Sequence, residues 1–171
     1  ALWWYWPVLR PVPDPLSIEI SPVEPRLFFT EAAVAMNRET VVKQAAPLLA
    51  MTGFPTVADK STPPPSGDPR DYQSLSIYWW PDPDKKDGLP WIHRDGEKNP
   101  AVGEFDPPKR RKATHSALTL AKAWKVTGET AYAEKAARIL RVFFLSETTG
   151  MNPNLNFAQG IPGRKPGNRQ G

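Results

Sequence analysis

The sequence predicts a mostly α-helical single domain that carries a long loop rich in proline and aromatic residues. Three observations lead to this prediction. The chain has 171 residues, about the size of one ordinary domain. Two segments in its second half repeat apolar residues at spacings of three and four, which places them on one face of a helix. The chain also contains 21 Pro, more than twice the usual share of about 5%, so long stretches must be irregular.

The first 26 residues are expected to form a separate, extended lead-in. Proline removes a backbone donor and fixes φ, so the many prolines of this segment leave no room for a helix or a central strand. A helix is expected to follow, with Thr30 as its candidate N-cap and an apolar stripe that reaches Leu49. We expect this helix to be bent or broken near Pro47 and to end before Gly53.

The middle of the chain is predicted to be a long ordered loop. Residues 61–69 contain too many Pro, Ser and Gly for regular structure. Residues 71–108 then show neither a helical period nor a clear strand period. Loops of this length in compact domains are usually functional or disordered, and the high aromatic content here argues against disorder.

Two amphipathic helices are predicted after the loop, over residues 113–126 and 130–145. Only three residues separate them, and Gly128 is placed to adopt the left-handed conformation that stops a helix. The two segments should therefore form an antiparallel helical hairpin, in which small alanines allow close approach.

Composition excludes several classes of function. The 22 Lys+Arg against 18 Asp+Glu give a mild net charge of +4, and the densest basic run is only residues 109–112, so no nucleic-acid partner is expected. The absence of Cys excludes disulfides and thiol catalysis. No apolar run has the roughly 18 residues that span a membrane. No His, Asp and Glu cluster has metal-ligand spacing, so we expect neither a metal nor another cofactor.

Several dense motifs, in the right order, closely resemble the N-terminal half of the alginate-lyase superfamily domain, including its glucuronan-lyase-like members. The resemblance extends over residues 25–164. The segments that carry it are residues 66–68, 71–72, 74–75, 78–83, 88–90, 94–97, 99–100, 127–128, 132–136 and 151–159.

The resemblance implies a fold and a substrate. Such relatives are α/α toroids of about six or seven helical hairpins and cleave uronic-acid polysaccharides by β-elimination. We therefore expect residues 27–171 to form part of an incomplete α/α toroid that binds an anionic polysaccharide such as alginate or glucuronan. Because these polymers lie outside the cell, an extracellular or periplasmic location is expected. The resemblance leaves the oligomeric state open.

The amide-rich motif near the C-terminus is the candidate catalytic segment. β-Elimination requires a group that neutralises the uronate carboxylate, a base that takes the C5 proton and an acid that protonates the leaving oxygen. Amide N–H groups suit the first role, and we assign it to Asn154 and Asn156, with Gln159 binding substrate. Asn152 is expected to close a turn instead, because Asn-Pro commonly starts turns.

Aromatic residues of the long loop are candidate sugar platforms, because an aromatic ring packs against the apolar face of a pyranose. Equally, they can serve to lock the loop onto the helices. Arg94 can bind a substrate carboxylate, although an internal pair with Asp95 or Glu97 is favoured. The aromatic candidates are Tyr78, Trp79, Trp80 and Trp91.

The general base has no candidate with a matching motif. In relatives a His, in an Asn-Asn-His segment downstream of the amide-rich motif, and a Tyr act as base and acid. This sequence has no such segment, and neither His93 nor His115 lies in a catalytic motif. Twelve helices with their connections also need about 200 residues. We therefore expect a fragment of a longer lyase, the alternatives being a non-catalytic polysaccharide-binding relative and a structural or interaction module.

Overall fold

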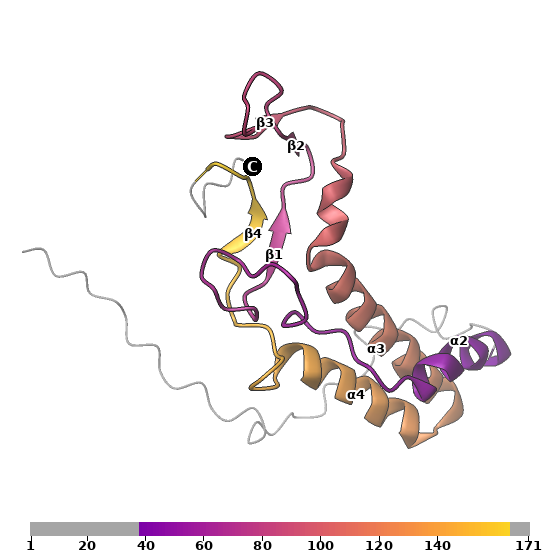
Figure 1. Cartoon of the computed structure of the whole chain (residues 1–171). Coiled ribbons are helices and arrows are strands. Elements are labelled where there is room, and N and C mark those ends of the chain that lie inside the picture. Colours follow the sequence, from indigo (N-terminus) through magenta and orange to yellow (C-terminus); the bar gives the residue numbers. More distant parts are fainter. Residues whose placement is uncertain (1–37, 165–171) are drawn as a thin grey trace, which may run out of the picture. The chain divides into compact units, whose positions relative to one another are not determined.

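The computed structural model describes residues 38–164 (Figure 1). The extended lead-in expected over residues 1–26, and the beginning of the helix expected from Thr30, lie outside the described residues. Within them the order of elements is α2, β1, β2, β3, η2, α3, α4 and β4. The described chain is mostly helical, as predicted, with three α-helices and four very short strands. The toroid implied by the resemblance stays a prediction.

Helix α2 (Arg38–Ala50) continues through Pro47, so of the bend or break expected there, the break does not occur. Pro47 lacks the N–H that would bond to the Lys43 carbonyl, and packing of α2 into the core offsets this lost hydrogen bond. Val41 and Ala45 are buried in the core that α2 shares with the other helices, and this packing stabilises the helix.

Helix α3 (Pro107–Thr127) begins six residues before the predicted start at residue 113. Pro107 and Pro108 occupy its first turn, where the missing N–H of a proline has no intrahelical acceptor to lose. The helix ends as predicted: Gly128 has φ 77°, and its N–H donates to the Trp124 carbonyl at 2.8 Å. Prolines that appeared to exclude a helix thus initiate one.

Helix α4 (Thr130–Phe144) forms the predicted hairpin with α3, and α2 packs beside it (Figure 1). The core between the three helices contains Leu120, Ile139 and Phe143, all fully buried. Small alanines of α3, Ala113 and Ala117, let the helices approach each other. Burial of each large core side chain contributes about 1.5–3 kcal/mol to folding.

The loop predicted over residues 71–108 is less irregular than expected. Strand β1 (Gln73–Leu75) pairs in parallel with β4 (Phe157–Gly160), and β2 (Trp79–Trp80) pairs antiparallel with β3 (Ile92–His93). A 3-10 helix, η2 (Pro100–Glu104), follows. Strands of two to four residues are too short to produce the alternation that identifies a strand in a sequence.

Candidate functional site

The parallel pairing of β1 with β4 brings the aromatic loop and the amide-rich motif together, although they lie more than 80 residues apart (Figure 1). The register pairs Gln73 with Phe157 and Leu75 with Gly160. The backbone of Gln159 is held from both sides: its N–H donates to the Ser74 Oγ at 2.9 Å, and its carbonyl accepts from the Ser76 hydroxyl at 2.8 Å.

Gln159 adopts a backbone conformation that is rare for its residue type. Its φ is 53°, in the left-handed region, and it is the one residue other than glycine with a positive φ among residues 38–164. Such strain costs about 1–3 kcal/mol and concentrates at functional sites. The surrounding hydrogen bonds maintain it, and the side chain of Gln159 is exposed to solvent.

Asp71 anchors the amide-rich motif to the loop. Its carboxylate is buried, with 6% of the residue exposed, and Oδ1 accepts from the side-chain amides of Asn152 at 2.8 Å and Asn154 at 3.0 Å. The Asn152 amide also donates to Asp68 Oδ2 at 3.0 Å, and its backbone N–H donates to the Arg70 carbonyl. The Asn152 side chain is thus a long-range structural link to residues 68–71, whereas the sequence predicted that it closes a local turn.

The three predicted site amides differ in how many of their hydrogen-bonding groups the protein already uses. Asn154 is half-buried: its Nδ2 donates to Asp71, and its Oδ1 accepts from the Asn156 backbone N–H at 3.1 Å. Asn156 and Gln159 are exposed, and their side chains form no hydrogen bond with any described residue. Asn154 therefore has one amide N–H left for a ligand, whereas Asn156 and Gln159 present their whole amide groups.

Hydrogen bonds keep both carboxyl groups of this cluster ionised. The pKa of Asp68 is lowered to about 2 by the backbone N–H of Arg70, the amide of Asn152 and the guanidinium of Arg70. Burial alone would raise the pKa of Asp71, but hydrogen bonds from the side chains of Asn152, Asn154 and Ser66 lower it overall. Both groups therefore carry a negative charge at neutral pH.

These shifts predict a loss of stability in acid. Because both pKa values are lower in the folded chain than in the unfolded chain, their stabilisation is complete above about pH 4 and is lost as pH falls. For Asp68 this loss continues down to about pH 2. Urea unfolding at several pH values measures this dependence. Asn152→Ala removes a donor from both Asp68 and Asp71 and should make the dependence shallower. An unchanged pH dependence of stability in Asn152→Ala would contradict the claim that Asn152 lowers the pKa values of Asp68 and Asp71.

Trp79 is the least accessible of the predicted aromatic platforms. Only 7% of the residue is exposed. Its ring lies 5.5 Å from that of His93, and the guanidinium of Arg164 stands over it at 4.5 Å from the ring centre. The Asn99 side chain donates to the Trp79 carbonyl at 2.8 Å. Trp79 thus holds the β2–β3 pair in place, and Arg164 occupies the ring face.

The other predicted platforms are more open. Trp80, Trp91 and Tyr78 are half-buried. Trp80 donates its indole N–H to the Glu97 carbonyl at 2.8 Å, and the guanidinium of Arg94 lies 5.5 Å from its ring centre. Arg94 also forms the expected internal pair with Glu97, at 3.5 Å.

Sequence analysis missed two residues of this region, Asp71 and Arg164. An aspartate in a loop is normally interpreted as a turn residue, and no pattern marks it as the acceptor for amides some 80 positions later. Arg164 follows a Pro-Gly turn and reaches Trp79 only because β4 returns the chain to the loop. Neither contact produces a recognisable pattern in the sequence around Asp71 or Arg164.

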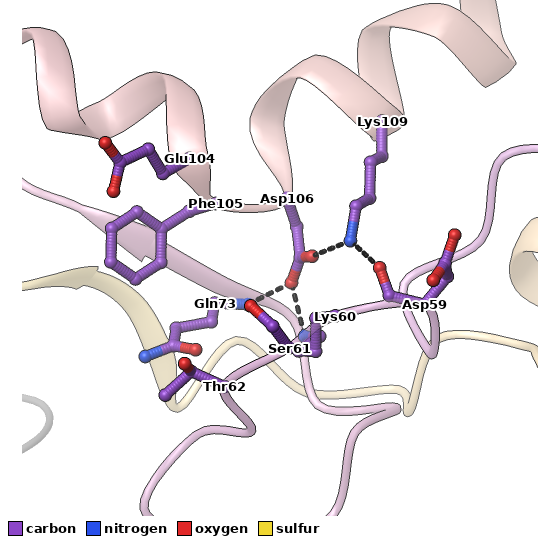
Figure 2. Close-up of a pocket in the computed structure, with 9 residues that line it drawn as sticks. All are labelled: Asp59, Lys60, Ser61, Thr62, Gln73, Glu104, Phe105, Asp106 and Lys109. Carbon is purple, nitrogen blue, oxygen red and sulfur yellow. Dashed lines mark hydrogen bonds and ion pairs between the residues drawn. The ribbon is translucent and has the colours of Figure 1, made fainter.

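A second feature is a pocket of about 280 Å³ at the start of α3 (Figure 2). Asp106, 1% exposed, lies at its wall and accepts from the Lys60 ammonium at 2.5 Å and the Gln73 N–H at 2.8 Å. Lys109 lies 3.6 Å from the same carboxylate and also donates to the Asp59 carbonyl. Lys60 and Lys109 both bind groups of the protein itself. We therefore assign this cluster a role in stabilising the fold, not in binding a ligand.

The part of the chain that the structure describes shows no group of three or more His, Asp or Glu placed to hold a metal ion. Over residues 38–164, no helix is both long and apolar enough to cross a membrane. Both histidines are exposed: His93 lies on β3 with its ring 6.3 Å from that of Tyr78, and His115 lies on α3.

Comparison with known proteins places this geometry in context. The sequence profile of the alginate lyase family matches residues 56–171. The crystal structure of an alginate lyase from Bacteroides ovatus superposes with a TM-score of 0.68 at 42% sequence identity, over 74% of this chain and 33% of that protein. The chain thus spans about one third of the length of that relative. No curated protein matches the sequence.

Proposed function

Because the chain belongs to the alginate lyase family, we propose that it forms part of a polysaccharide lyase that binds an anionic uronic-acid polymer, such as alginate or glucuronan, for cleavage by β-elimination. The observation that carries the proposal is the β1–β4 pairing, which brings the amide-rich motif beside the start of the aromatic loop. Such polymers occur outside cells, so the proposal includes an extracellular or periplasmic location.

In this proposal the amides recognise the uronate carboxylate. Removal of the C5 proton places negative charge on that carboxylate, and N–H donors stabilise this charge without adding a charge of their own. The exposed amides of Asn156 and Gln159 can reach a ligand directly, and Asn154 offers its remaining N–H. Asp71 fixes the orientation of the Asn154 amide.

Aromatic and cationic groups of the loop would hold the sugar rings. Trp80 and Trp91 are half-buried, and indole rings suit stacking against a pyranose. Arg164 is exposed, and no carboxylate of the described residues forms an ion pair with it. A guanidinium held by Trp79 suits a carboxylate of the polymer, because it pairs with both oxygens at once.

A non-catalytic, polysaccharide-binding relative is the second candidate function. The amides, aromatic rings and guanidinium of the described site would serve it as well, because they bind sugars and carboxylates without a general base. The two candidates share the binding surface and differ in the product, because β-elimination creates an unsaturated uronate that absorbs ultraviolet light. Turnover in this chain would make His93 and its neighbour Tyr78 the first residues to replace.

The test replaces the two exposed amides by isosteric carboxylates. Asn156→Asp and Gln159→Glu replace N–H donors with negative charge, which costs about 1–4 kcal/mol against a ligand carboxylate about 4 Å away. We expect each variant to bind alginate or glucuronan oligosaccharides about ten-fold or more weakly by calorimetry. Ultraviolet absorbance in the same samples reports elimination.

Gln44→Glu is the matched control, because Gln44 is an exposed amide on α2, away from the motif. This variant should bind like the parent, and all three variants should keep the parent's thermal unfolding curve. Parent-like affinity in both Asn156→Asp and Gln159→Glu would contradict the proposed role of the amides.

A further inference from the structure

The excess positive charge of the chain resides on one helix. Helix α3 contains six Lys and Arg and no Asp or Glu. The whole chain has 22 Lys+Arg and 18 Asp+Glu, so the remainder carries 16 basic against 18 acidic residues. Without α3 the chain would have a slightly negative net charge. The mild net charge of the whole chain therefore results from one strongly basic helix.

Most of these cations are available to a partner. Lys109 is engaged by Asp106 and Asp59 beside the pocket (Figure 2). The other five form no ion pair with any carboxylate in the described part of the chain. Four of them are exposed and Lys122 is half-buried. The five cations are Arg110, Arg111, Lys112, Lys122 and Lys125.

Helical geometry arranges three of these cations in a line. Residues spaced by alternate steps of four and three lie on one face of a helix. On α3 this spacing selects the residues that we call the α3 stripe: Arg111, His115, Leu118, Lys122 and Lys125. The stripe extends for about 21 Å at 1.5 Å per residue. It is exposed except for the half-buried Lys122.

Folding explains only Lys125, which lies in the last turn of α3, where the helix dipole favours a cation. Lys122 and Lys125 are three residues apart and repel each other, because like charges at this spacing destabilise a helix. Arg110 and Arg111 lie near the N-terminus of α3, where the helix dipole favours anions. Solvated helix faces normally alternate the sign of their charges, and α3 has no acidic residue to do so. A bound polyanion would remove each of these costs.

We propose that the α3 stripe is a second contact surface for the polyuronate, in addition to the surface formed by the amide-rich motif. The inference takes its polymer class from the proposed function, and charge complementarity selects it, because each sugar of a polyuronate carries a carboxylate. The stripe has no Trp, Tyr or Phe on which the bases of a single-stranded nucleic acid could stack, and His115 is its one ring. One leucine is too little apolar surface for membrane insertion.

Two contact surfaces on one polymer have a measurable consequence. A long chain that occupies both surfaces gains affinity over a short oligosaccharide that occupies one. The stripe contact is electrostatic, so it should weaken as salt displaces the polymer's counterions. Binding of long polyuronate should therefore be tighter and more dependent on salt than binding of a trisaccharide.

The experiment compares two triple variants of equal charge. Arg111→Gln, Lys122→Gln and Lys125→Gln together neutralise the stripe. Arg38→Gln, Lys43→Gln and Arg141→Gln together remove three exposed cations of α2 and α4 that form no ion pair among residues 38–164. Affinities for long alginate and for a trisaccharide of uronate are measured at about 50 and about 200 mM salt. Thermal unfolding checks that both variants remain folded.

We expect the stripe variant to bind long alginate about ten-fold more weakly than the parent at low salt, with a shallower salt dependence. Its affinity for the trisaccharide should match that of the parent, and the control variant should resemble the parent in both assays. Equal losses in the two variants would overturn the inference, because net charge alone would then explain the binding. Equally tight, stripe-dependent binding of duplex DNA or anionic vesicles would overturn it too.

The same data separate this inference from the proposed function. Loss of trisaccharide binding in Asn156→Asp tests the surface of the amide-rich motif, which the stripe variant leaves intact. A parent that binds long alginate through the stripe, but shows no trisaccharide binding, would contradict the proposed function and support the stripe. If the parent binds the trisaccharide and the stripe variant binds long alginate like the parent, the proposed function is supported and the stripe is contradicted.

Discussion

Replacing Asp106 with alanine is expected to lower the free energy of unfolding by about 3–5 kcal/mol. Asp106 is 1% exposed, and the side chain of its partner Lys60 is 8% exposed, so the substitution would leave a buried ammonium without its carboxylate. The Gln73 N–H would lose its acceptor as well. Urea unfolding, followed by circular dichroism, should show a lower midpoint with an unchanged slope.

Asp95→Ala is the matched control, because Asp95 is an exposed aspartate in a turn of the same loop. Its effect should stay within about 0.5 kcal/mol. A loss of less than about 1 kcal/mol in Asp106→Ala would mean that the ion pair with Lys60 does not join residues 59–62 to α3 as described.

Asp71→Ala is expected to cost about 2–4 kcal/mol and to release the amide-rich motif from the loop. Hydrogen bonds to charged groups contribute about 1.5–3 kcal/mol each, and Asp71 accepts two from the amides of Asn152 and Asn154. The substitution leaves the Asn154 amide without its acceptor and the Asn152 amide with Asp68 alone. Hydrogen exchange of residues 152–160 should accelerate more than exchange in α3 and α4.

Asp71→Asn distinguishes the contribution of the negative charge of Asp71 from that of its side-chain shape. It keeps a side-chain oxygen as acceptor, so we expect a smaller loss of stability and slower exchange than in Asp71→Ala. If residues 152–160 of Asp71→Ala exchange at the parent's rate, another contact holds the motif, and the positioning role assigned to Asp71 is wrong.

Local features of the fold were predictable from the sequence. The hairpin of α3 and α4 follows from apolar spacing and from Gly128, whose left-handed conformation depends on only a few neighbouring residues. The start of α3 was not predicted, because prolines exclude a helix interior yet favour its first turn, and the sequence alone does not distinguish these positions. Pro47 is a different case, because the burial of Val41 and Ala45 maintains α2 despite the missing N–H.

Long-range contacts of the candidate site were not predictable. The pairing of β1 with β4 involves strands of three and four residues, too short for a periodic signal. The bond between Asn152 and Asp71 joins positions 81 apart, and nothing local at Asp71 indicates it. Sequence reasoning identified the amides Asn156 and Gln159 as candidates, but only the fold distinguishes them from the anchored Asn154.

Binding of uronate oligosaccharides to the 171-residue chain is the measurement to make first. Calorimetric titrations with alginate and glucuronan oligosaccharides would be compared with a neutral glucan of the same length. Recognition by the amides and Arg164 predicts saturable binding of at least one uronate and none of the neutral glucan. A folded chain that binds neither uronate, or that binds the neutral glucan equally well, would contradict the proposed function.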